Sequence, residues 1–175
     1  MLQEIWQTIV AEFSDIPDVE TMTKVTIRIL IAAMLGGILG YERERKSISA
    51  GVRTHMLVAV GAAIFMIGPA QAGISVPDLS RVIQGVIQGI GFLGAGAIIF
   101  STSTRTVQGL TTAASIWAAA GIGIAAGLGM EATAVLSTFI VLFVLAIVPL
   151  FTKWIRKEPH DTVSETGSIV DDAIK

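Results

Sequence analysis

Charged and imidazole side chains that could do chemistry gather in two short segments, residues 41–46 (YERERK) and 53–55 (RTH). A Mg²⁺ site needs one or two carboxylates and several waters in octahedral geometry. On a helix, however, Glu42 and Glu44 diverge by about 200°. Glu42 instead faces the basic residues at i+3 and i+4, which is the spacing of ordinary ion pairs. We therefore favour a membrane-interface anchor over an ion or partner site, and we predict no metal ion.

The second segment offers a pH-sensing alternative. His55 could titrate near neutral pH, but a histidine at the start of a membrane helix more often caps or snorkels, and we favour that role. If the two segments meet across a helical hairpin, Glu42 or Glu44 would pair with Arg53. The candidate functional residues here are Glu42, Arg43, Glu44, Arg45, Arg53, Thr54 and His55.

A glycine motif raises the question of a nucleotide. Gly89, Gly91 and Gly94 form G-x-G-x-x-G within GIGFLGAGAIIF. A dinucleotide site needs a preceding strand and an acid about 20 residues later, whereas here an apolar segment precedes and no acid follows before Glu131. We therefore predict no nucleotide and no other cofactor. Small residues instead let membrane helices approach closely, and the candidate packing residues are Gly36, Gly40, Gly85, Gly89, Gly91, Gly94, Gly96, Gly109, Gly123 and Gly127, with Trp117 packed against glycine.

The segment that holds this motif also carries a polar stripe, with Arg81, Gln84 and Gln88 on one helical face. Intramembrane polar residues are costly and often functional, yet glutamines also join neighbouring helices, so both interpretations stay open. Asp78 either pairs with Arg81 at the helix start or leaves Arg81 at the mouth of the stripe. One face of this helix carries glycines (Gly85, Gly89 and Gly96) and the adjacent face is polar, so we predict that the helix is central and buried on most sides.

Hydroxyl groups mark the next apolar segment. Thr111, Thr112 and Ser115 lie near its start, where they are expected to bond back to backbone carbonyls.

Composition shows which elements must position these residues. The 175 residues are 53% hydrophobic and 15% charged, against about 25% charged in soluble domains. Five segments approach the roughly 20 apolar residues of a spanning helix, namely 25–40, 56–72, 82–100, 109–127 and 132–152. We predict an all-α, polytopic membrane bundle of about five transmembrane helices plus an N-terminal amphipathic helix.

Three regions are predicted along the chain. Residues 1–20 form an amphipathic helix and linker on the outer surface or over the bundle, residues 21–153 form the transmembrane domain, and residues 154–175 form a short polar tail. The segments ISVPDLS and STSTRT are predicted turns. Most of the twelve Lys and Arg residues fall on one side of five spans, which places the N-terminus outside and the C-terminus in the cytoplasm.

Several functions are excluded by absent residue types. There is no cysteine, and we find no catalytic triad or paired buried carboxylates, so we predict that the protein is not an enzyme. No basic cluster interleaved with aromatics suggests nucleic-acid binding. The expected partners are the lipid bilayer and either a second copy of the chain or another membrane protein complex.

Three blocks, residues 36–63, 88–99 and 107–129, resemble the MgtC/SapB family of bacterial inner-membrane proteins. The resemblance implies a polytopic inner-membrane protein without established enzymatic chemistry. The family namesake is linked to growth under magnesium limitation and to acid stress, and is proposed to act by restraining the proton-driven ATP synthase. Longer relatives carry a folded C-terminal domain, so this chain is expected to be a short form.

We therefore expect a regulatory membrane protein that acts through helix contacts. The alternative is a channel or transporter for an ion or small solute, lined by the polar stripe. An enzyme acting on lipid ranks last, because no nucleophile or metal set is present.

Overall fold

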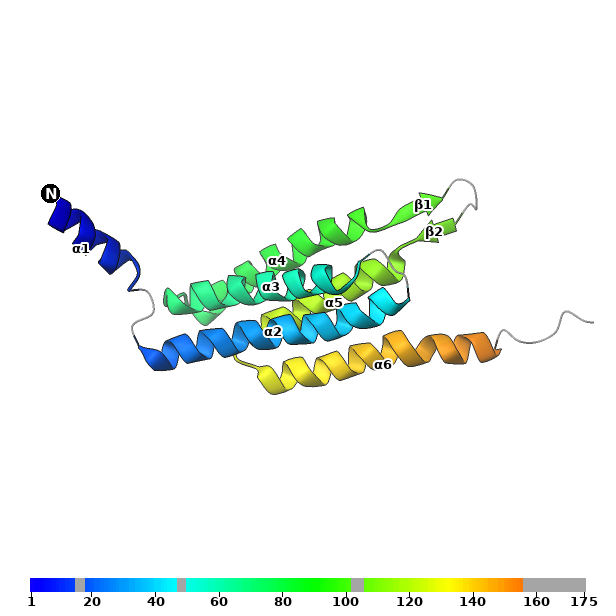
Figure 1. Ribbon diagram of the computed structural model, residues 1–175. Helices are drawn as coiled ribbons and strands as arrows, with labels where there is room; N and C mark the ends of the chain where they lie inside the picture. The colour runs from blue at the N-terminus through cyan, green and yellow to red at the C-terminus, as the bar shows by residue number, and fades with distance from the viewer. Residues whose placement is uncertain (15–17, 47–49, 102–105, 156–175) are drawn as a thin grey trace, which may run out of the picture. The chain divides into compact units, whose positions relative to one another are not determined.

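The computed structural model describes residues 1–14, 18–46, 50–101 and 106–155 (Figure 1). The elements in chain order are α1 (Leu2–Glu12), α2 (Val19–Arg45), α3 (Val52–Gln71), α4 (Val76–Gly96), β1 (Ile99–Ser101), β2 (Thr106–Gln108), α5 (Leu110–Gly127) and α6 (Glu131–Ile155). The predicted all-α helical bundle is confirmed. The exception is a small antiparallel hairpin in which Ile99 of β1 lies opposite Gln108 of β2.

The chain divides into two units, Met1–Leu142 and Phe143–Lys175, which we describe separately. The described part of the second unit is the later half of α6, which contains Pro149. The predicted tail beyond residue 155 lies outside the described residues, as do residues 102–105 of the predicted STSTRT turn.

Four of the described helices are long and apolar enough to cross a membrane: α2, α3, α5 and α6 as far as Pro149. The chain is therefore a membrane protein. The segment predicted as the third span is the helix α4, but it does not meet this criterion. Its length of 21 residues suffices, so the shortfall comes from the polar side chains that it carries.

Helix boundaries differ from the predicted spans where polar residues extend a helix beyond its apolar part. The helix α2 starts after Asp18, whose Oδ1 accepts the backbone N–H of Thr21 at 2.6 Å. This hydrogen bond lowers the pKa of Asp18. At the other end α2 continues through the YERER residues to Arg45. The predicted ISVPDLS turn is wrong from Val76 onward, because α4 begins there with a proline in its first turn.

The core of the first unit forms around α3, which packs against α2, α4 and α5 (Figure 1). A Cβ on Gly36 of α2 would lie 2.6 Å from the carbonyl oxygen of His55, and one on Gly40 would lie 2.6 Å from the Cα of Val52. The backbones of α2 and α3 are therefore in direct contact. This is the close approach that the predicted packing role of both glycines requires.

The helix α5 packs against α3 in the same way. A Cβ on Gly123 would lie 2.1 Å from the carbonyl oxygen of Ala59, and one on Gly127 would lie 2.6 Å from that of Ala63. These contacts too are of the kind that the predicted packing role requires. The helices α2 and α5 both approach α3 through glycines and also contact each other, so the three helices form one core.

The prediction that the helix of the GIGFLGAG motif is central and buried on most sides is wrong for the single chain. A Cβ built on any of four of its glycines would meet no described atom within 4 Å. These are Gly85, Gly89, Gly91 and Gly96. Gly94 does touch Ala113 of α5, at an ordinary contact distance. The reason is that α4 packs on α3 and α5 through its buried and half-buried valine and isoleucine residues, and these four glycines lie outside that contact.

Two other predicted packing residues have different outcomes. Gly109, between β2 and α5, has φ +88°, and a Cβ there would lie 2.0 Å from the carbonyl oxygen of Ala97. Only glycine fits this left-handed, crowded position. Trp117 is 54% exposed, contrary to the prediction that it packs against glycine.

The predicted N-terminal amphipathic helix is present as α1, whose residues are all exposed. Whether it lies on the membrane surface stays a prediction.

Candidate functional site

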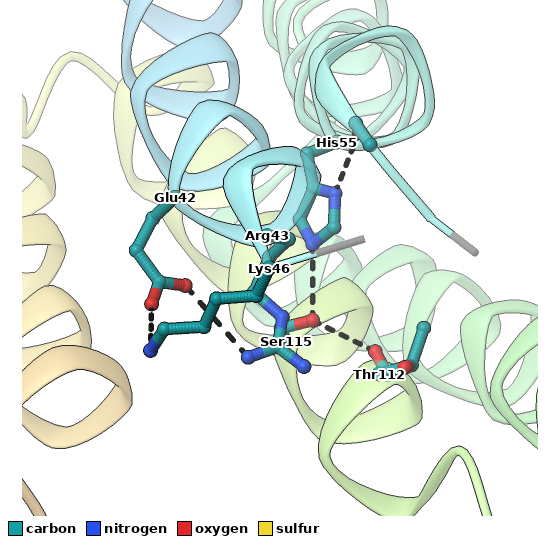
Figure 2. Close-up of polar contacts among 7 residues, drawn as sticks. Glu42, Arg43, Lys46, His55, Thr112 and Ser115 are labelled. Carbon is teal, nitrogen blue, oxygen red and sulfur yellow. Dashed lines mark hydrogen bonds and ion pairs between the residues drawn. The ribbon is translucent and has the colours of Figure 1, made fainter. Parts of the chain in front are cut away.

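A buried histidine stands at the junction of α2, α3 and α5. His55 lies in the first turn of α3 and has no exposed surface. Its Nδ1 is 2.9 Å from the carbonyl oxygen of Gly51, and its Nε2 is 3.0 Å from Oγ of Ser115 on α5 (Figure 2). Because a carbonyl only accepts hydrogen bonds, Nδ1 carries a proton and donates it to Gly51. The favoured prediction of a capping or snorkelling histidine is therefore wrong: the ring points into the bundle and joins two helices.

The hydroxyl of Ser115 extends this chain of hydrogen bonds. Its Oγ is 2.8 Å from the carbonyl oxygen of Thr112 (Figure 2), as predicted for a hydroxyl near the start of this helix. A serine hydroxyl has one proton to donate. With a neutral His55 ring, that proton goes either to Nε2 or to Thr112. All three contacts form together only when the ring carries protons on both nitrogens, so with a neutral ring one of the three hydrogen bonds is not made at any moment.

Two charged side chains of α2 lie beside this hydrogen-bond chain. Arg43 is only 4% exposed, and its Nη1 is 3.7 Å from Oε2 of Glu42 (Figure 2). The other carboxylate oxygen of Glu42 forms an ion pair with Lys46, as the i+4 spacing predicted. Among the described residues, neither the Nε of Arg43 nor the Glu42 oxygens have a hydrogen bond of good geometry. Buried charges are costly unless paired, so this group depends on its ion pairs.

The predicted pairing of Glu42 with Arg45 is not what the described structure shows. The Arg45 guanidinium instead lies 5.9 Å from the ring centroid of Tyr41, within cation–π range. Arg45 therefore stays at the surface, while Lys46 takes the carboxylate of Glu42.

The predicted ion pair across the loop is replaced by a helix cap. Glu44 does reach α3, but its Oε2 accepts the backbone N–H of Val52 at 2.9 Å. Arg53 is exposed and has no ion pair within the described part of the chain. The first N–H groups of a helix have no partner within it. This explains why the carboxylate of Glu44 bonds to the backbone of Val52 and not to Arg53.

We expect Glu44→Ala to destabilise the protein by about 1 kcal/mol, the usual effect of losing a helix cap. Glu44→Gln keeps an acceptor oxygen and should lose less, and Arg53→Ala should be near neutral. Thermal unfolding in detergent would measure all three. If Arg53→Ala lost as much stability as Glu44→Ala, the ion pair between Glu44 and Arg53 would be the better interpretation.

The polar stripe of α4 lies apart from this cluster. Arg81, Gln84 and Gln88 are all exposed, and none has a hydrogen bond or ion pair to another described residue. Asp78 accepts a hydrogen bond from the Ser75 hydroxyl at 2.6 Å instead of pairing with Arg81. The stripe is therefore an outward face of the single chain.

The remaining predicted hydroxyl residues are divided between interior and surface. Thr112 is buried beside Ser115, whereas Thr111 is exposed. Thr54 is half-buried and lines a pocket of about 430 Å³ together with Phe92 and Gly96 of α4. Among the described residues, no three His, Cys, Asp or Glu side chains lie close enough to hold a metal ion.

A second polar contact, at the other end of the bundle, was missed from the sequence. Arg28 of α2 donates from Nη1 to the carbonyl oxygen of Gly127 at 3.3 Å, and its Nε lies 3.8 Å from Oε1 of Glu131. Gly129, with φ +79°, leaves room for the guanidinium. No local pattern identifies these partners, although a charge inside a span is itself a signal for a specific partner.

The model of the MgtC family matches residues 29–154. SrpB of Synechococcus elongatus is 39% identical over 134 residues, which cover 70% of this chain and 73% of SrpB. No solved structure matches the chain.

Two further relatives are longer than the matched region. The putative magnesium transporter YhiD of Escherichia coli is 40% identical over 98 residues, or 52% of this chain and 45% of YhiD. MgtC of Brucella abortus is 42% identical over 118 residues, or 67% of this chain and 48% of that protein. The match thus spans about half the length of these two relatives.

Proposed function

Because the chain belongs to the MgtC family, we propose that it is a non-enzymatic inner-membrane protein that regulates adaptation to magnesium limitation or acid stress. It acts through helix contacts with a membrane partner, and the ATP synthase is the first candidate. Its N-terminus lies outside and its C-terminus lies in the cytoplasm.

The outward position of the α4 polar stripe carries this proposal. A conduit within one chain would enclose its polar residues, whereas Arg81, Gln84 and Gln88 are exposed. The three-helix core is closed by direct backbone contacts at glycine. Polar groups on an outer helix face are suited to bonding with another helix.

Transport of an ion or small solute is the second candidate. It is favoured by the relative named a putative magnesium transporter and by the same polar stripe. Against a Mg²⁺ pathway, no acidic residue occurs between Asp78 and Glu131, and cation pores usually employ carboxylates or backbone carbonyls.

Flux measurements in sealed liposomes distinguish the two functions. We expect vesicles that contain the folded protein to be as tight to protons and Mg²⁺ as empty vesicles. Gln88→Leu and Arg81→Ala should leave that tightness unchanged. Flux that disappears in both variants would overturn regulation by contact and make the stripe a conduit.

Co-reconstitution with ATP synthase tests the regulatory step directly. ATP-driven acidification of the vesicle lumen should fall when the protein is present. An unchanged acidification rate would remove the ATP synthase as the partner.

A further inference from the structure

The helix α4 extends across the same distance as its apolar neighbours. The contact between His55 and Ser115 places the start of α3 beside the start of α5. The contact between Ala63 and Gly127 places their later parts side by side as well. The two helices are therefore parallel. Because α4 connects the end of α3 to the hairpin that precedes α5 (Figure 1), it must return through the thickness that α3 crosses.

This course brings an exposed polar face into the membrane. Gln84 and Gln88 lie one and two turns beyond Arg81 on the same side of α4, and all three are exposed without a described partner. In hydrocarbon, a polar group without a hydrogen bond is strongly destabilising. Lipid tails cannot supply the missing hydrogen bonds, so another polar surface must cover this face.

The same face leaves room for a second helix. A Cβ built on Gly85 or Gly89 meets nothing within 4 Å. Both glycines open into an apolar groove of about 720 Å³ between α3 and α4. Next to them, Phe92 is 83% exposed. The face therefore combines a cavity with a large apolar side chain that could fill the equivalent cavity of a neighbour.

We propose that this face is the contact between two copies of the chain, with their α4 helices side by side about a twofold axis along the membrane normal. Two copies in one membrane have the same orientation, so their α4 helices are parallel. A glutamine amide both donates and accepts, so Gln88 can bond to Gln88 of the second copy.

Charge complementarity also supports this occupant. Asp78 and Arg81 are one turn apart on α4 and are not paired with each other in the described structure. In a parallel pair, Asp78 of each copy lies near Arg81 of the other. A twofold contact thus gives the glutamine amides hydrogen-bond partners, pairs the opposite charges and fills the apolar groove. The same surface of both copies does this, as in other isologous interfaces.

Cysteine cross-linking in native membranes tests the contact, because the chain contains no cysteine. We expect Gln84→Cys and Gln88→Cys to form disulfide-linked dimers under mild oxidation. Ile83→Cys should not, because Ile83 is half-buried on another side of α4 and does not line this groove. Leu136→Cys is exposed on α6 and measures random collision. Gln88→Cys yields no higher than those of Leu136→Cys would overturn the proposal, as would adducts with a different protein only.

Charge reversal gives a second measurement that does not alter the glutamines. Asp78→Arg and Arg81→Asp should each lower the dimer fraction in mild detergent several-fold, and the double variant should restore it. A monomer at all concentrations for the wild type, or a double variant no better than the single ones, would contradict the twofold contact. These measurements are independent of the flux result, because they detect association whether or not anything is transported.

Discussion

Leucine in place of Gly123 is expected to prevent the bundle from forming. Even a Cβ at this position would lie 2.1 Å from the carbonyl oxygen of Ala59 and 2.8 Å from its Cα. Both are backbone atoms, so α3 and α5 would have to separate. Overpacking a core costs about 1–3 kcal/mol when side chains can adjust, and the cost here should exceed that range. Yield of monodisperse protein and the Tm in detergent would measure the loss.

Gly121 provides the matched control two residues earlier on α5. It is exposed, and a Cβ there meets nothing within 4 Å. Gly121→Leu should therefore fold with a Tm near that of the wild type. If Gly123→Leu folds as well as Gly121→Leu, the direct contact between α3 and α5 is wrong.

Removing the buried imidazole should have the second large effect. His55→Leu keeps a side chain of similar bulk but removes the hydrogen bonds to Gly51 and Ser115. Loss of a buried hydrogen-bond partner costs about 1–3 kcal/mol. We expect a destabilisation of that size in thermal or denaturant unfolding.

A double-mutant cycle with Ser115→Ala isolates the contact between the two side chains. If Nε2 of His55 bonds to Ser115, the two losses should be non-additive by about 0.5–1.5 kcal/mol. Thr111→Val removes an exposed hydroxyl near the start of the same helix, so it should be neutral and show no coupling. Strict additivity of His55→Leu and Ser115→Ala would rule out a hydrogen bond that contributes to stability.

The helices and their order were predictable from the sequence, because hydropathy over about 20 residues and the residues that cap a helix are local properties. Every segment predicted to span contains a helix in the structure. The ends differ where polar residues extend a helix, as at the YERER end of α2, and where the predicted span 82–100 ends in β1 instead of in α4. The i+4 pair of Glu42 with Lys46 is local in the same sense. Helix geometry places Lys46 within reach of Glu42, but it did not decide between Lys46 and Arg45.

The partners of each helix face depend on tertiary structure. The same G-x-x-x-G spacing occurs at Gly36, at Gly85 and at Gly123, yet the first and last contact α3 while Gly85 opens outward. A small residue determines that a backbone can approach, but not which backbone does. For the same reason no local pattern indicated that His55 bonds to a serine 60 residues away. The sequence by itself thus determined the elements and their membrane character, and only the packing of α2 and α5 on α3 decided which polar residues became a buried cluster and which became an exposed face.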